Sequence, residues 1–232
     1  FDITEIRDNE IQLLDPTLVY PIFRVESREN FERLINADER NFKQPEDKNV
    51  IPAVNFQITD DHLGEGGPKQ KYVRNIEAIR LLYTLEEEKR NATPEEQEVL
   101  SQYVGWGGLA DAFDSNKSAW SKEYAELKNL LPEREYEMAR ASTLNAHYTS
   151  PVVIRAMYDA MAQMGFTSGN ILEPAMGIGN FFGMLPEEMR NSRLYGVELD
   201  SISGRIAKKL YPNADITVAG FETTDRRDFF DV

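Results

Sequence analysis

The sequence predicts an α/β fold: a doubly wound parallel sheet preceded by an α-helical domain and an irregular N-terminal arm. From Gly169 onward, short apolar segments alternate with helical patterns in the order strand, helix, strand, helix, strand, which is typical of βαβ units. Between about residues 55 and 145, apolar residues recur three or four positions apart, which predicts helices. We therefore expect a mixed arm over residues 1–54, a mainly helical domain over 55–145 and an α/β core over 146–232.

The arm is acidic and carries only scattered apolar residues. Leu18–Val25 predicts one or two short strands around a proline, and Glu29–Ala37 has the spacing of a helix. No residue type here points to chemistry. We expect the arm to pack on the domain that follows it.

The helical domain begins after an alternating segment, Val54–Ile58, which predicts a strand. Thr93 precedes Pro94 and Glu96, the pattern of a capping box at a helix start. Three glycines then surround Trp106. A stacked base or cofactor would explain this run, as would packing of the tryptophan into a helical core, which we favour. Helices are expected over Asn75–Arg90, Pro94 to near Tyr103, Ser118–Leu130, Pro132–Ser142 and Val152–Met164.

The α/β core is organised around one stretch, N-I-L-E-P-A-M-G-I-G-N-F from Asn170 to Phe181. A short buried strand ends before Glu173 and Pro174, and Gly177 and Gly179 then allow a tight turn into a helix. Such a turn brings backbone N–H groups and the positive end of a helix close to a ligand. With Asn180, these groups suit a nucleoside that carries hydroxyls and an amino-acid tail. An ordinary strand–turn–helix connection is the alternative.

Two further strands extend this pattern. Leu194–Val197 is followed by Glu198, about 20 residues past the glycine turn, where an acid takes ribose hydroxyls in βαβ units. A solvated acid is the other interpretation of Glu198. Asp215–Ala219 leads to Phe221 and Glu222, which we expect to line the adenine side of the crevice. Asp228–Val232 is expected to begin a fourth strand, at which the chain stops.

Composition excludes several kinds of site. The chain of 232 residues has no cysteine, so it has neither a thiolate metal site nor a cysteine nucleophile. His62 and His147 are the only imidazoles and are far apart in sequence, so we expect no metal. No apolar run reaches the length of a membrane span and no basic–apolar leader is present. We expect a cytoplasmic protein without membrane contact.

The net charge of −14 argues against a nucleic-acid surface on this chain, because phosphate binding needs clustered lysine and arginine. Lys69, Lys71 and Arg74, beside a glycine-rich loop, form one small basic cluster. They either touch a phosphate or balance nearby acids, and we favour the second interpretation.

Three motifs together resemble a known family: Tyr148-Thr149-Ser150-Pro151, E-P-A-M-G-I-G-N-F from Glu173, and Gly196-Val197-Glu198-Leu199-Asp200. They look like the cofactor-binding motifs of S-adenosylmethionine-dependent DNA adenine methyltransferases. The longer context, from about Asn55 onward, is similar to the methylase-like region of very large helicase–methylase proteins of conjugative elements and phages. Two departures stand out: Glu173 replaces the more usual Asp, and Ala-Met-Gly-Ile-Gly replaces the commoner Ala-Cys-Gly-Ser-Gly.

The resemblance implies a Rossmann-like methyltransferase sheet, truncated after its fourth strand, so that residues 146–232 form an incomplete S-adenosylmethionine-binding core. In related enzymes a Tyr-Thr-Pro turn holds the methionine end of the cofactor, which transfers to Tyr148 and Thr149. The residues expected to bind the cofactor are Tyr148, Thr149, Glu173, Pro174, Ala175, Gly177, Gly179, Asn180, Phe181, Glu198, Leu199, Phe221 and Glu222.

In the resembled family, an Asn-Pro-Pro-Phe-like loop after the fourth strand positions the acceptor amino group. This chain contains no such tetrapeptide, so we assign no catalytic residue. The resemblance implies the cofactor-binding part of a DNA adenine methyltransferase from a mobile element, inactive by itself. DNA and a helicase region are expected as partners through the rest of a parent chain. The alternative is a non-catalytic architectural module, and methylation of protein or RNA is a further one.

Overall fold

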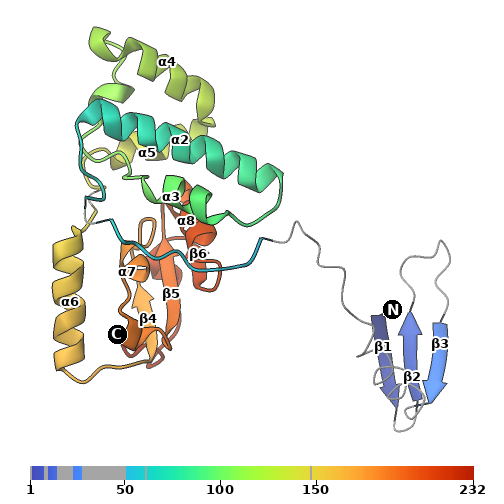
Figure 1. The fold of residues 1–232 in the computed structure, drawn as a ribbon. Coiled ribbons are helices and arrows are strands. Elements are labelled where there is room, and N and C mark those ends of the chain that lie inside the picture. Colours follow the sequence, from blue (N-terminus) through green and yellow to red (C-terminus); the bar gives the residue numbers. More distant parts are fainter. Residues whose placement is uncertain (1, 8–9, 15–22, 28–50, 61, 147) are drawn as a thin grey trace. The chain divides into compact units, whose positions relative to one another are not determined.

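The structure is a computed structural model that describes residues 2–7, 10–14, 23–27, 51–60, 62–146 and 148–232 (Figure 1). Contacts between residues divide the chain into two units, Phe1–Val50 and Ile51–Val232. Among the described helices, none is long and apolar enough to cross a membrane.

The first unit contains a three-stranded antiparallel sheet. Its strands, in the order β1-β2-β3, are β1 (Asp2–Arg7), β2 (Glu10–Leu14) and β3 (Phe23–Ser27). The prediction of an irregular arm is therefore wrong for β1 and β2, whereas β3 overlaps the segment Leu18–Val25 in which one or two strands were expected and of which residues 18–22 lie outside the described residues. A β-bulge between Ile3 and Glu5 interrupts the two-residue period of β1. Because strands are predicted from this alternation, β1 was not predicted from the sequence. The helix expected over Glu29–Ala37 lies outside the described residues.

Helices dominate the first half of the second unit. Thr93 caps α3 as expected, since its hydroxyl accepts the Glu96 N–H at 3.2 Å and the Glu96 carboxylate accepts the Thr93 N–H at 2.8 Å. The longest helix begins at Pro68, earlier than predicted, because Gly67 and Pro68 form its start. The helices are α2 (Pro68–Glu87), α3 (Pro94–Ser101), α4 (Ser121–Leu130) and α5 (Glu133–Ser142), with 3₁₀ turns at Ala110–Phe113 and Ser118–Trp120.

A parallel sheet forms the second half, with strands in the order β4-β5-β6. Leu172 lies opposite Tyr195, and Gly196 lies opposite Ile216, so the carboxyl ends of all three strands share one edge. The elements are α6 (Pro151–Gln163), β4 (Asn170–Glu173), α7 (Asn180–Gly183), β5 (Arg193–Glu198), α8 (Ser201–Leu210) and β6 (Asp215–Val218), with 3₁₀ turns at Glu187–Met189 and Phe221–Thr223.

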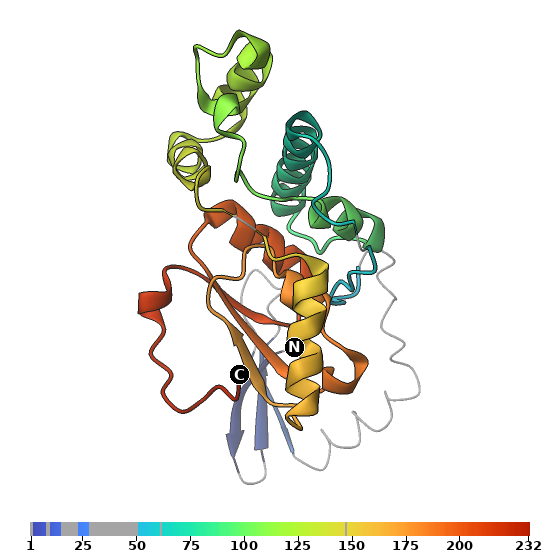
Figure 2. The ribbon, with the colours of Figure 1, turned by 90° about the vertical axis from the view of Figure 1, so that its left-hand side faces the viewer.

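The helices and the sheet share one hydrophobic core. Helix α8 packs on β5 and β6 and also contacts α2 and α3, whereas α6 lies beside the sheet (Figures 1 and 2). The Arg205 guanidinium on α8 bonds to Glu86 of α2 and Glu135 of α5. Val54–Ile58 forms no strand, although the Phe56 N–H donates to the Leu210 carbonyl and the Ile58 N–H to the Gly183 carbonyl.

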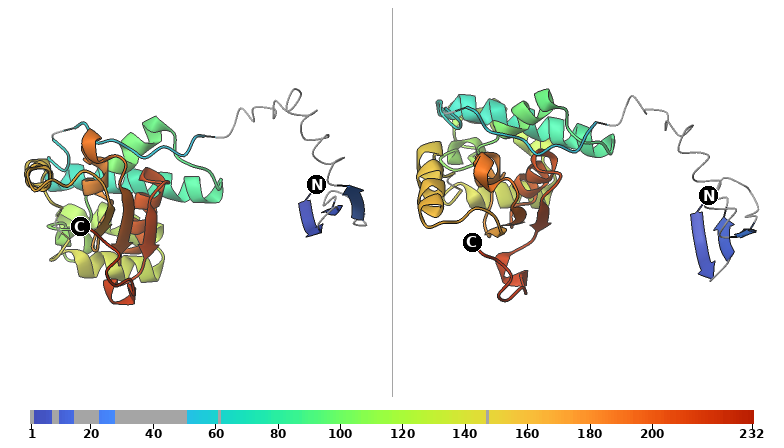
Figure 3. Two further views of the ribbon diagram at one scale, coloured as in Figure 1. Left: turned by 90° about the horizontal axis from the view of Figure 1, so that it is seen from below. Right: turned by 60° about the horizontal axis from the view of Figure 1, so that its bottom comes forward.

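The expected fourth strand over Asp228–Val232 is not formed, so the truncated four-stranded sheet predicted from the sequence is wrong. The described residues of the second unit contain three parallel strands, seen side by side in Figure 3. Asp228 has a φ of +52°, which a strand cannot accommodate. Asp231 and Val232 bond to β4 without forming a strand: the Asp231 N–H donates to the Asn170 carbonyl, the Leu172 N–H donates to the Val232 carbonyl, and the Asn170 N–H donates to the Asp231 carboxylate at 2.7 Å.

Candidate functional site

A cavity of about 640 Å³ opens at the carboxyl ends of β4 and β5. Glu173 ends β4 and Glu198 ends β5, so the two neighbouring parallel strands bring both carboxylates to its wall. This is the edge where open α/β sheets bind ligands. The structure gathers there most of the residues singled out from the sequence: Tyr148, Thr149, Glu173, Ala175, Gly177, Asn180, Phe181, Glu198 and Leu199.

Four other predicted site residues, Pro174, Gly179, Phe221 and Glu222, do not line this cavity. Gly179 has a φ of +86°, and a Cβ there would lie 2.6 Å from the Tyr211 ring. The absence of a side chain at Gly179 therefore allows the Tyr211 ring to pack against the turn. Phe221 is 53% exposed in the 3₁₀ turn after β6, and Glu222 is exposed beside it.

The ring of Tyr148 is held between two glycine backbones. A Cβ on Gly177 would lie 2.9 Å from one edge of the ring, and a Cβ on Gly105 would lie 3.0 Å from the other edge. Both glycines have positive φ, so other residues would also be strained there. The tyrosine thus joins the glycine turn of the sheet to the glycine-rich loop of the helical region.

Glu198 fixes the shape of the glycine turn. Its carboxylate accepts the Gly177 N–H at 2.6 Å and the Asp200 N–H at 2.7 Å. Burial raises the pKa of Glu198, and these two hydrogen bonds oppose the rise. The carboxylate therefore holds the two segments that follow β4 and β5 at a fixed separation and still presents acceptor lone pairs to the cavity.

Glu173 is the most perturbed acid of the site. Burial, and secondarily the charge of Glu198, raises its pKa from the ordinary 4.5 to about 8. Its Oε2 is buried and has no hydrogen-bond partner among the described residues, and the same holds for Oδ1 of Asn180. Buried polar groups are normally hydrogen-bonded, so these two atoms mark a place where a polar ligand fits. A cation in the cavity would favour the ionised carboxylate.

The helical region supplies a wall that the sequence did not predict. The buried Asn75 side chain of α2 accepts the Val104 N–H at 2.9 Å and donates to the Gly105 carbonyl at 2.6 Å. This clamp holds the loop that carries Tyr103 and Trp106 against the cavity. The Gly-Trp-Gly-Gly run from Gly105 was the sequence feature that could have indicated this wall. Cavity-lining residues missed in the sequence are Tyr103, Gly105, Trp106, Met138, Ala141, Ser142, Asn145, Ala146, Met176, Asp200 and Ser203.

Trp106 is only 1% exposed and has a packing role. Its ring meets Phe113 edge-on at a centroid distance of 5.2 Å and also contacts Tyr72 and Tyr103. The favoured interpretation, burial in a helical core, therefore describes most of the ring, with one part reaching the cavity.

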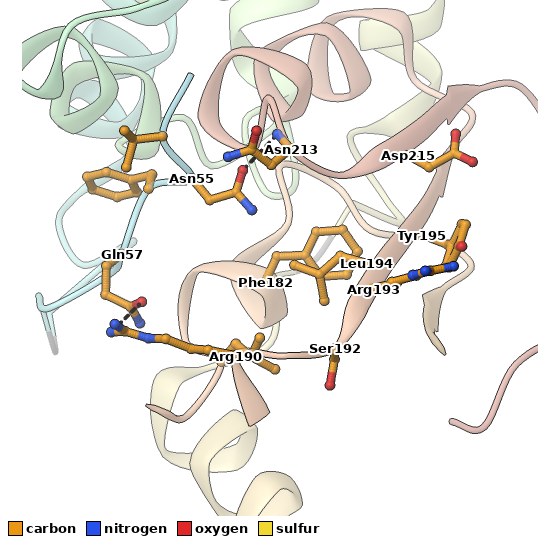
Figure 4. Close-up of a pocket in the computed structure, with 13 residues that line it drawn as sticks. Asn55, Gln57, Phe182, Arg190, Ser192, Arg193, Leu194, Tyr195, Asn213 and Asp215 are labelled. Carbon is orange, nitrogen blue, oxygen red and sulfur yellow. Dashed lines mark hydrogen bonds between the residues drawn. The ribbon is translucent and has the colours of Figure 1, made fainter. Parts of the chain in front are cut away.

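A separate cavity of about 720 Å³ lies at the amino ends of β5 and β6 (Figure 4). None of the residues predicted for the site lines it. Its polar side chains mostly bond to the protein: Arg190 to Gln57 and Glu187, and Asn213 to the Ala53 carbonyl. We assign no ligand to it. In the described part of the chain, no cluster of three or more His, Asp or Glu side chains is arranged to hold a metal.

Comparison with known proteins finds a phage relative. A stretch of 148 residues, 64% of this chain, is 24% identical to the protein named "Defense against restriction protein B" of Escherichia phage P1. The match spans 5% of that phage protein. No family model and no solved structure matches the chain.

Proposed function

We propose that this chain binds S-adenosylmethionine at the carboxyl ends of β4 and β5 and is the cofactor-binding part of a DNA adenine methyltransferase of a mobile genetic element. The observation that carries the proposal is the unpartnered, buried carboxylate of Glu173, which faces a cavity shared with Glu198 at the end of the next strand. An acidic cavity suits a ligand with positive charge and hydroxyl groups.

The residues present fit the cofactor. A volume of about 640 Å³ lies within the usual range for small-molecule sites. Glu173 would take positive charge, Glu198 would accept hydroxyl groups, and Phe181 and Leu199 would pack against a base. The bound cofactor would supply an electrophilic methyl group. The side chains of this chain hold and orient it and exclude water, and we place no acceptor-positioning residue among them.

The phage relative supports the context of the proposal. Its name refers to defence against restriction. Methylated bases alter the pattern of groups that proteins read in the major groove, so methyl transfer to DNA is compatible with such a role. The net charge of −14 implies that DNA is captured by basic surfaces of other segments or proteins.

Titration calorimetry with S-adenosylmethionine tests the proposal. We expect binding at pH 7 to release protons, because the carboxyl of Glu173, with a pKa of about 8, is largely protonated before a cation enters. The release is measured from the binding heat in buffers of different ionisation enthalpy. Glu173→Gln should bind with a smaller release. Absence of binding at every pH between 6 and 9 would refute the proposal and favour an architectural role.

A further inference from the structure

One wall of the cavity at the carboxyl ends of β4 and β5 comes from a helix that buries few apolar side chains. Helix α5 lines this cavity through Met138, Ala141 and Ser142. Of its ten residues, Tyr136 and Ala139 are the buried ones. Because tertiary packing of an apolar face fixes most helices in place, polar contacts have a larger share in setting the position of α5.

A single carboxylate ties α5 to two other helices. Glu135 lies in the first turn of α5, and both of its carboxylate oxygens accept hydrogen bonds. Oε1 accepts from the Arg205 guanidinium and, at 3.3 Å, from the Ser201 hydroxyl, both on α8. Oε2 accepts from the Tyr83 hydroxyl of α2 at 2.7 Å. Among the described residues, no other α5 side chain hydrogen-bonds to α2 or α8.

The contact between Glu135 and Arg205 is largely shielded from solvent, because the two side chains are 15% and 26% exposed. Arg205 also pairs with Glu86 of α2 at 2.8 Å, and its guanidinium lies over the Tyr83 ring. Its orientation is therefore fixed independently of α5. Charge-assisted hydrogen bonds that are shielded in this way are stronger than exposed ion pairs, so Arg205 is a firm anchor for α5.

The anchored residue and the cavity wall lie on one face of α5. Residues three, four and seven positions apart share a face of an α-helix. Glu135, Met138 and Ser142 have this spacing, and the last two line the cavity. Ser203 of α8, which lies in the sequence between the two residues that bond to Glu135, also lines the cavity. A shift of α5 relative to Arg205 would therefore change the separation of the two helices at the cavity.

We infer that Glu135 and Arg205 are positioning residues of the ligand site: their contact sets the distance between the α5 wall and α8, and thereby the affinity for the ligand. Neither side chain lines the cavity. A displacement of about 1 Å in a site is nevertheless enough to impair its function strongly. The inference rests on the proposed function for the identity of the ligand, whereas the position of α5 is measured without any ligand.

Hydrogen exchange of the full chain without ligand tests the position of α5. Glu135→Gln keeps the size of the side chain but removes the charge that Arg205 contacts. We expect the amides of residues 138–142 to exchange about tenfold faster in this variant, relative to the amides of β5, which is the usual scale for a charge-assisted contact. Arg205→Met should give a similar increase. The double variant should not exceed it, because both substitutions remove the same contact.

Two controls separate position from general stability. Glu133→Gln makes the same substitution in the same turn of α5, at a side chain that is 80% exposed. Ile79→Val weakens the buried core of α2 without touching the contact. Both should leave the ratio of α5 exchange to β5 exchange as in the wild type. If Glu135→Gln does not fold, Tyr83→Phe removes one hydrogen bond of the carboxylate without a change of charge and should raise the same ratio by a smaller factor.

Calorimetry with S-adenosylmethionine tests the consequence for the site. Glu135→Gln should bind about tenfold more weakly than the wild type, and Glu133→Gln should bind as the wild type does. An unchanged exchange ratio in Glu135→Gln, or an unchanged affinity in a variant whose α5 exchanges faster, overturns the inference. If the wild type does not bind S-adenosylmethionine, the proposed function fails, and the exchange measurement alone decides whether the contact positions α5.

Discussion

Replacing Glu173 by glutamine should change how stability depends on pH. The side chain keeps its size but loses its ionisable proton. In the folded chain the carboxyl has a pKa of about 8 instead of the ordinary 4.5, so the folded state binds this proton more tightly than the unfolded state. Stability contributed by Glu173 is therefore present below pH 4.5 and is lost as the pH rises toward 8.

The magnitude follows from the two pKa values. Their difference corresponds to at most roughly 5 kcal/mol once the carboxyl is fully ionised. Glutamine carries no such cost, so Glu173→Gln should gain stability relative to the wild type as the pH rises from 5 to 8.5. We expect the difference between the two proteins to grow by several kcal/mol over this interval.

Urea unfolding at pH 5, 7 and 8.5 measures this difference. Glu222→Gln is the matched control, because it makes the same substitution at an exposed acid outside the cavity. Saturating S-adenosylmethionine should stabilise the wild type more than Glu173→Gln at pH 8.5. If the difference in unfolding free energy between wild type and Glu173→Gln stays constant from pH 5 to 8.5, the assignment of Glu173 as a buried carboxyl with a raised pKa is wrong.

Three other substitutions separate binding from packing. Glu198→Ala should weaken S-adenosylmethionine binding by about 2–4 kcal/mol in calorimetry, while Glu222→Ala leaves it unchanged; equal affinities would remove Glu198 from the site. Gly179→Val should lower the thermal unfolding temperature, because the new side chain meets Tyr211 and φ is positive, and a stable variant that fails to bind would show instead that Gly179 faces the ligand. Trp106→Ala should cost about 3–5 kcal/mol in urea unfolding, and a loss below 1 kcal/mol would contradict its core role.

The sequence by itself determined the local features of the site. The glycine turn after Glu173 and the acid at the end of β5 follow from apolar segments that end in polar residues. Parallel strands necessarily bring such ends to one edge. The capping box at Thr93 is equally local, since all of its hydrogen bonds join residues three positions apart. Short-range patterns of this kind are independent of the rest of the fold.

Only the tertiary structure decided which surfaces meet. Gly177 faces Tyr148 and the cavity, whereas Gly179, two residues later, faces Tyr211 in the core. Both glycines look alike in a motif, and packing against tyrosines about 30 positions away along the chain separates their roles. Whether Asp228–Val232 pairs as a strand likewise depended on backbone angles and on the side-chain hydrogen bonds made by Asn170.

The wall of the cavity that the helical region supplies could not be predicted from the sequence for the same reason. Asn75 holds the Val104–Gly105 segment from about 30 residues away, and that loop then closes on Tyr148. Neither contact leaves a periodic signal, because each joins single residues of separate elements. The sequence specifies which groups are available at the strand ends, and long-range packing selects which of them share a cavity.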